Sequence, residues 1–102
     1  MDLNTAEERI YDWATERGII ANGKPMGQAI KTLEEVTELI AAINEGDIDG
    51  VKDAIGDVFV TLVNVAGTSG LTMEECVGAA WEEIKDRKGY LTPQGVFVKE
   101  KR

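Results

Sequence analysis

The chain has 102 residues, with 11 lysines and arginines against 19 aspartates and glutamates, a formal net charge of −8 and no histidine. The lack of histidine excludes a Ser-His-Asp triad, histidine-ligated zinc and an imidazole base. The acidic balance argues against binding to a nucleic-acid polymer, and one cysteine suits a reducing cytosol. We therefore expect a soluble cytoplasmic protein that has no membrane span and binds any metal through oxygen atoms.

Capping residues and glycines divide the chain into four expected helices with short connections. The first helix opens at the capping box Thr5-Ala6-Glu7-Glu8 and ends near Arg17, and residues 19–25 form a connection. The next two helices are expected over about 26–44 and 47–66. A second capping box, Thr72-Met73-Glu74-Glu75, opens the fourth helix, which is expected to end within 85–88, before Gly89.

The four helices predict an all-α bundle in a single domain, 1–102. The bundle is expected to occupy 1–90, followed by an extended tail over 91–102, in which Val96-Phe97-Val98 alternates like an edge strand. The third helix is apolar around most of its circumference, which is typical of a buried helix. A chain of this size buries only about two-thirds of its unfolded surface, so we expect oligomerisation to complete the bundle.

The second expected helix carries a stripe of carboxylates. At about 100° per residue, Glu34, Glu35 and Glu38 fall on one face. Lys31 lies beside this stripe, and aliphatic residues occupy the opposite side. Because like charges at this spacing repel by about 0.2–0.5 kcal/mol, the arrangement has a small cost. Taken alone, the pattern is more typical of a solvated helix face than of a binding site.

The third expected helix carries polar residues within its apolar surround. Asp53, Asp57 and Asn64 lie, together with Thr61, within roughly 80° of one another on the helical wheel. Isolated ionised carboxylates are costly to bury and are normally paired with a cation or bound to a metal. Salt bridges to another helix would also explain them, but 11 basic residues for 19 acids leave few partners.

The short connection over 45–48 predicts that the second and third helices run antiparallel, so that their acids face each other around one cavity. Oxygen ligands favour a hard divalent cation, and Mg²⁺ typically combines a few carboxylates with substrate phosphates. Such an ion would also separate these acids from a nucleoside triphosphate that they would otherwise repel. The pattern therefore points to a magnesium site that acts on a phosphate substrate.

In their order and spacing, these motifs resemble the MazG-like all-α nucleoside triphosphate pyrophosphohydrolases. The short form with a Gly-Val-Phe-Val tail looks like small phage or prophage members. The residues that carry the resemblance are Glu34-Glu35-Val36-Thr37-Glu38, Asp53-Ala54-Ile55-Gly56-Asp57, Asn64, the segment from Glu82 to Gly89, and Gln28 and Lys31 upstream.

The resemblance implies a Mg²⁺- or Mn²⁺-dependent hydrolase that cleaves a nucleoside triphosphate between its α- and β-phosphates, releasing the monophosphate and pyrophosphate. It also implies a homodimer or homotetramer in the cytosol of a bacterium or a phage-infected host. Glu35, Glu38 and Asp57 match the family's metal ligands. The family's remaining glutamate falls at Ala54, and Asp53 is the candidate to replace it.

The remaining candidate residues are expected to accept a proton or to bind the substrate. With no histidine available, either Glu34 or Glu38 is expected to accept the proton of the attacking water. Substrate binding is expected of Gln28, Lys31, Asn64, Lys85, Arg87 and Lys88. The last three residues would equally complement the dipole of a helix C-terminus, and Lys31 can pair with a neighbouring glutamate instead. The alternative function is a noncatalytic acidic helical module that binds nucleotide or protein.

Overall fold

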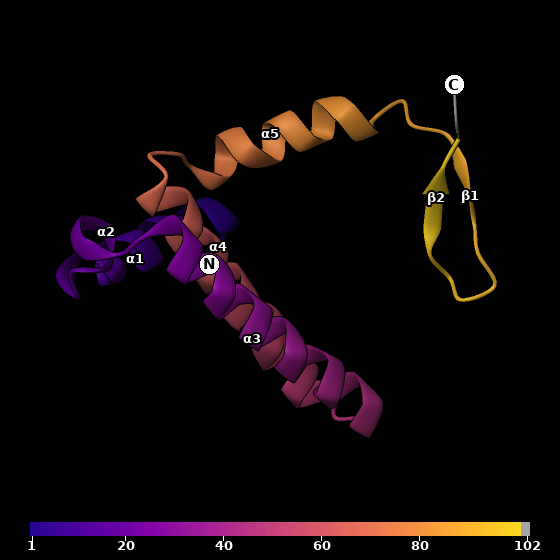
Figure 1. Ribbon diagram of the computed structural model, residues 1–102, viewed down its shortest axis with the longest axis horizontal. Helices are drawn as coiled ribbons and strands as arrows, with labels where there is room; N and C mark the ends of the chain where they lie inside the picture. Colours follow the sequence, from indigo (N-terminus) through magenta and orange to yellow (C-terminus); the bar gives the residue numbers. More distant parts are fainter. Residues whose placement is uncertain (101–102) are drawn as a thin grey trace.

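The structure, a computed structural model, describes residues 1–100, which form five helices and one β-hairpin (Figure 1). The predicted tail therefore extends two residues beyond the described part. In chain order the elements are α1 (Leu3–Glu16), α2 (Ile19–Asn22), α3 (Pro25–Glu45), α4 (Ile48–Thr68), α5 (Met73–Ile84), β1 (Gly89–Leu91) and β2 (Phe97–Lys99). This composition confirms the all-α class.

Helices α3 and α4 form the long pair at the centre of the molecule (Figure 1). Gly46 ends α3 in the left-handed conformation, with φ 69°, which favours glycine. The side chain of Asp47 then accepts a hydrogen bond from the backbone nitrogen of Gly50 at 3.0 Å and begins α4. Between the two helices, Thr32 Oγ1 donates to Thr61 Oγ1 at 2.8 Å. The predicted antiparallel pairing is confirmed.

Two expectations near the N-terminus are wrong. The first helix begins at Leu3 rather than at Thr5, because Asp2 accepts a hydrogen bond from the backbone nitrogen of Thr5 at 2.8 Å and caps it. The same hydrogen bond holds the pKa of Asp2 below its ordinary value. The expected connection after Gly18 contains the short helix α2, which follows a left-handed turn at this glycine, with φ 76°.

The second capping box is confirmed, but the helix that it opens is shorter than expected. Thr72 Oγ1 accepts from the backbone nitrogen of Glu75 at 3.2 Å, and Glu75 Oε1 accepts from that of Thr72 at 2.7 Å. Helix α5 then ends at Ile84, before the basic residues. Strand β1 pairs antiparallel with β2, with Leu91 opposite Phe97. The strand predicted over 96–98 is thus shifted by one residue, to 97–99. Strand β1 begins at Gly89, within the range 1–90 that was expected to contain only the helical bundle.

Helix α5 is not a fourth member of a bundle within one chain. It is bent by 102° from α4, and together with the hairpin it projects away from the other helices (Figure 1). Trp81 on α5 is 57% exposed. Within residues 1–100, no helix taken singly is both long and apolar enough to cross a membrane, and α4 and α5 meet that criterion only as this bent pair.

The chain leaves an unusually large apolar surface uncovered. The buried hydrophobic residues in the described part are Ala14, Ala42, Ala54, Val63 and Ala66. The accessible surface is 7912 Å², whereas a compact monomer of 11.1 kDa exposes about 5,700 Å². The Cα radius of gyration is 15.8 Å, against about 12.8 Å expected for this length. Since Ile55 is 56% exposed, the expected burial of α4 is not achieved within one chain.

Candidate metal centre

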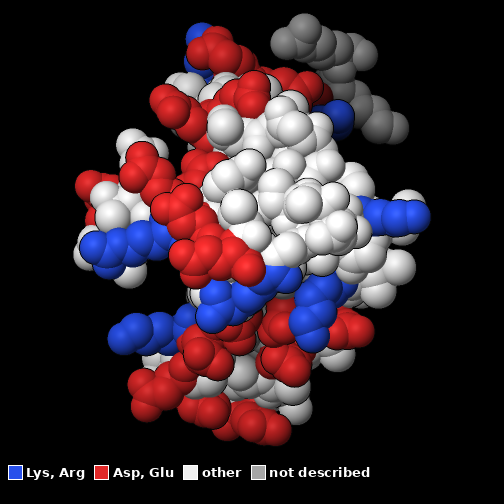
Figure 2. Space-filling model, turned by 90° about the vertical axis from the view of Figure 1, so that its left-hand side faces the viewer, with Lys and Arg blue, Asp and Glu red and all other residues white. Residues whose placement is uncertain are grey.

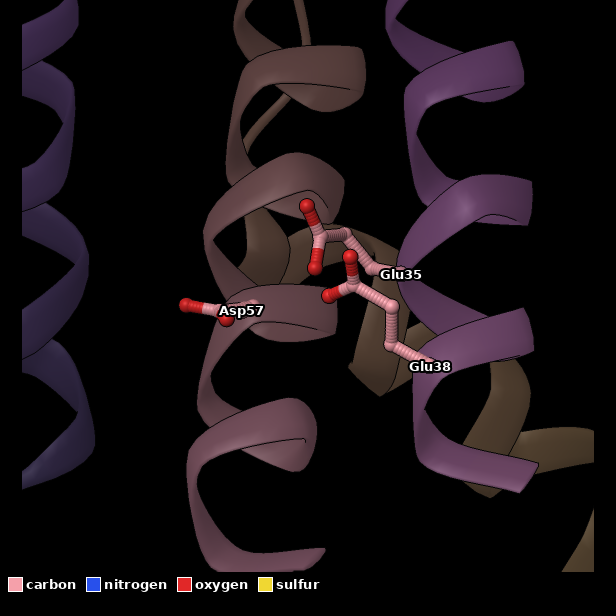
Figure 3. Close-up of side chains that lie close together, drawn as sticks. All are labelled: Glu35, Glu38 and Asp57. Carbon is pink, nitrogen blue, oxygen red and sulfur yellow. The ribbon is translucent and has the colours of Figure 1, made fainter. Parts of the chain in front are cut away.

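Three carboxylates from two helices converge at the centre of the α3–α4 pair. Glu35 and Glu38 extend from α3 towards α4, which carries Asp57 (Figure 3). Each residue offers one oxygen atom, and these three atoms lie within 4.8 Å of one another. The spacing of three residues places both glutamates on the same side of α3. Antiparallel pairing then sets Asp57 opposite them, as the sequence predicts.

This group is crowded with negative charge and partly shielded from water. The Glu35 side chain is 13% exposed, and its buried Oε2 atom has no hydrogen-bond partner among residues 1–100. Burial raises the pKa of Glu35, and the neighbouring Glu38 and Asp57 raise it further, while Lys31 opposes them. Burial also raises the pKa of Asp57, with added repulsion from Asp53 and Glu38. A cation bound here would relieve both the repulsion and the desolvation.

These raised pKa values predict how the stability of the metal-free protein depends on pH. A carboxylate with a folded pKa above its unfolded value adds stability at low pH, and this contribution is lost as pH rises through the folded pKa. In EDTA at pH 7, Glu35→Gln should therefore melt several degrees above the parent, and the gap should close towards pH 4. Thermal melts across this range, with Glu8→Gln on the exposed face of α1 as the control, test this expectation. A gap that is independent of pH would contradict it.

A pocket of about 400 Å³ opens directly beside the three carboxylates. Glu35 and Asp57 form part of its wall, so the pocket and the acidic group share two residues. The structure also brings to this pocket three residues expected to bind substrate, Gln28, Lys31 and Asn64. The site thus combines a cluster of anionic oxygens with an adjoining pocket of mixed polarity, which is typical of small-molecule sites.

Two other predicted site residues lie beside this centre rather than in it. Glu34 accepts a hydrogen bond from Lys31 Nζ at 3.0 Å, and its side chain is 61% exposed. Lys31 also lies 3.8 Å from Glu35 Oε1. This pairing with Glu34, together with Glu35, raises the pKa of Lys31. Asp53 is exposed one turn before Asp57 and lies outside the group of three.

The three basic residues after α5 are not brought to the carboxylates within one chain. Lys85 Nζ donates to Glu82 Oε2 at 2.7 Å. Arg87 and Lys88 border a separate acidic and basic hollow at the far end of α5, where Figure 1 shows the chain leading away from α3 and α4. Any contact between these residues and the pocket would therefore require a second chain.

Residues outside the expected set of metal- and substrate-binding residues also line the pocket. Trp13 of α1 and Ile19 of α2 supply apolar wall, and Thr61 supplies a buried hydroxyl. The signal for Trp13 is weak, since a tryptophan on an amphipathic helix more often belongs to the core. Ile19 carries no signal, because its position depends on the short helix α2, which follows the left-handed turn at Gly18.

An all-α fold with glutamates on one helix facing an aspartate on the next defines a class of carboxylate-rich helical proteins suited to a divalent metal. Residues 28–92 match the family model described as the MazG nucleotide pyrophosphohydrolase domain. Because this match covers more than half of the chain and includes the acidic group, the chain belongs to the MazG family.

A phage protein is similar over much of the same region. It is an "Uncharacterized 18.2 kDa protein in rep-hol intergenic region" of Haemophilus phage HP1 (strain HP1c1), 37% identical over 65 residues. The alignment covers 64% of this chain and 40% of the phage protein, so this chain matches well under two-thirds of its relative's length. No solved structure matches the chain. The similarity supports a small phage-type member of the family.

Proposed function

We propose that the protein is a Mg²⁺-dependent nucleotide pyrophosphohydrolase. It cleaves a ribo- or deoxyribonucleoside triphosphate between the α- and β-phosphates, giving the monophosphate and pyrophosphate. The observation that carries this proposal is the convergence of Glu35, Glu38 and Asp57 within 4.8 Å beside a pocket large enough for a small ligand. Membership of the MazG family supports the same chemistry.

The residues of the acidic group fit a hard divalent cation. All three supply carboxylate oxygens, which suit Mg²⁺ and, as an alternative, Mn²⁺. The buried Oε2 of Glu35, which has no hydrogen-bond partner among residues 1–100, is an atom that such an ion could bind. We infer that Glu35, Glu38 and Asp57 hold the metal, and that Asp53 assists from one turn away.

A divalent ion bound here would supply a Lewis acid for the phosphate oxygens and lower the pKa of a nearby water. Of the two candidate bases, Glu38 is better placed to accept the proton of that water, because its carboxylate belongs to the group of three. Glu34 is instead engaged with Lys31 at 3.0 Å. Lys31, at the junction of the pocket and the acids, would orient and partly neutralise the phosphate chain.

The working unit in this proposal is a homodimer, or a tetramer built from dimers. One chain exposes about 2,200 Å² more than a compact monomer of its mass, an area in the range that obligate interfaces bury per subunit. Figure 2 shows a broad uncharged area, bordered by both acidic and basic side chains, on the side of the molecule where α1 and α2 lie. Through such an assembly Lys85, Arg87 and Lys88 of one chain would approach the pyrophosphate bound by another.

Restoring the family's missing glutamate should tighten metal binding. Ala54 is 4% exposed, one turn along α4 from Gly50, where an added Cβ atom would lie 3.3 Å from Ala42 Cβ on α3. Antiparallel pairing therefore sets position 54 near Glu38, one turn before Ala42. We expect Ala54→Glu to bind Mg²⁺ about tenfold more tightly than the parent in calorimetric titrations, with Ala54→Gln as the uncharged control. Unchanged or weaker affinity would indicate that Asp53 already provides the fourth carboxylate.

The reaction is tested by ³¹P NMR of a nucleoside triphosphate panel incubated with the protein, with and without Mg²⁺. The expected products are the monophosphate and pyrophosphate, formed only with the metal. Release of inorganic phosphate and a nucleoside diphosphate would place the cleavage between the β- and γ-phosphates and would contradict the proposed reaction. Mg²⁺-dependent nucleotide binding without any product would favour the noncatalytic binding module.

A further inference from the structure

One buried polar side chain in the pocket lacks a partner. Asn64 of α4 is 4% exposed, and within residues 1–100 no hydrogen bond reaches its buried Oδ1 atom. Its backbone oxygen, in contrast, accepts from Thr68 Oγ1 at 2.7 Å. Buried polar atoms in native proteins are nearly always hydrogen-bonded, so an orphaned one calls for an explanation. Because Asn64 lines the pocket, a ligand in that pocket is in a position to satisfy it.

The position of Asn64 along α4 indicates which part of a nucleotide it meets. Asn64 follows Asp57 by seven residues, and at 1.5 Å per residue this places it about 10 Å farther along the helix. If the acidic group holds the phosphates, an extended nucleotide spans a comparable distance from its α-phosphorus to the outer edge of its base. The sugar hydroxyls lie only a little over half as far from the α-phosphorus as the outer edge of the base does. Asn64 is therefore better placed for the base than for the sugar.

The chemistry of the surrounding wall suits a nucleobase. Trp13 of α1 offers an aromatic ring at the pocket, and Arg17 lies over that ring with its guanidinium carbon 4.8 Å from the centroid. Val60 adds apolar surface, and Gln28 adds a second amide. Flat apolar surface combined with amide groups matches a base, which has an apolar face and an edge of adjacent donors and acceptors.

We propose that Asn64 is a specificity-determining residue that hydrogen-bonds the edge of the substrate's nucleobase, its side-chain oxygen accepting from a ring or exocyclic N–H group. This proposal rests on the proposed function for the position of the phosphates. It assigns base recognition to the wall shared by α1, α3 and α4, at the end of the pocket away from Glu38. An asparagine amide both donates and accepts, so it can pair with an adjacent donor and acceptor on the base.

The test compares base-bearing substrates with one that has no base. In Asn64→Leu, kcat/KM should fall about 10- to 100-fold for the best of dATP, dCTP, dGTP and dTTP. It should stay within about twofold for the abasic 1,2-dideoxyribose 5-triphosphate, which offers no edge to Asn64. Asn64→Ser, a small polar replacement, should show the same pattern if the leucine variant does not fold. An equal loss for both substrates would overturn the proposal, because it would show a structural role.

Two further measurements keep this proposal separate from the hydrolytic one. Thr32 does not line the pocket, but its hydroxyl donates to Thr61, which does. Thr32→Val removes this hydrogen bond between α3 and α4 and should affect both substrates alike. Calorimetric binding of the matching nucleoside 5′-monophosphate with Mg²⁺ requires no turnover and should weaken about 10- to 100-fold in Asn64→Leu. If the parent hydrolyses no nucleotide, and the monophosphate still binds Asn64→Leu more weakly than the parent, the base site stands and the hydrolase proposal fails. If the monophosphate binds both proteins equally, the base site fails.

Discussion

Glu38→Gln is expected to lower kcat by about 10³-fold while leaving the helical circular dichroism unchanged. The substitution keeps the shape of the side chain but removes the negative oxygen that lies within 4.8 Å of Glu35 and Asp57. A metal ligand and a proton acceptor are lost together. Asp57→Asn should have a similar effect through the metal alone. Initial rates of pyrophosphate release at saturating Mg²⁺ give the comparison.

The control for this experiment is Glu45→Gln, which makes the same chemical change at an exposed position at the end of α3. It should retain the parent's rate. Both site variants should melt at or above the parent's temperature in EDTA, since each removes a charge from a crowded acidic group. Turnover at the parent's rate by Glu38→Gln and Asp57→Asn alike would show that the chemistry occurs elsewhere.

The double substitution Leu33→Glu with Ile40→Glu is expected to dissociate the oligomer. The two side chains are 65% and 62% exposed in the single chain, and their spacing of seven residues places them on the same face of α3. Burying two carboxylates in an apolar interface is strongly unfavourable. We expect the parent to sediment as a dimer or tetramer, and the variant to sediment as a monomer that melts at least about 10 °C lower.

Lys52→Glu provides the matched control, because it also changes the net charge by −2 at an exposed position. It should sediment like the parent. Sedimentation velocity at several concentrations makes the comparison, and activity measured on the same samples shows whether assembly is needed for turnover. A parent that is monomeric at every concentration would contradict the dimer.

The sequence was sufficient to predict the core of the site because the relevant signals are local. Gly46 and Asp47 lie within one turn of the sites where α3 ends and α4 begins, and the short connection between them forces antiparallel pairing. Given that pairing, helical periodicity places Glu35 and Glu38 on the side of α3 that faces Asp57, although it groups the exposed Glu34 with them. The converging carboxylates could therefore be predicted without any knowledge of long-range packing.

The outer parts of the fold could not be predicted in the same way. The hydrophobic pattern of Val77, Trp81 and Ile84 indicates an apolar face but not which chain covers it, and α5 projects away from its own α3 and α4. The capping box at Thr5 failed because Asp2, three residues earlier, accepts from the backbone nitrogen of Thr5, which the Glu8 side chain would bind in that box. Pocket residues such as Ile19 depend on the turn at Gly18, which periodicity does not describe.

Manganese binding followed by electron paramagnetic resonance most directly tests whether Glu35, Glu38 and Asp57 chelate a divalent ion. Titration of the parent should remove free Mn²⁺ signal with saturable binding, and added Mg²⁺ should compete for the same site. In the double variant Glu35→Gln with Asp57→Asn, binding should weaken at least about 100-fold, since two of three ligands lose their charge. Equal Mn²⁺ affinity in the parent and the double variant would contradict a metal centre at this position.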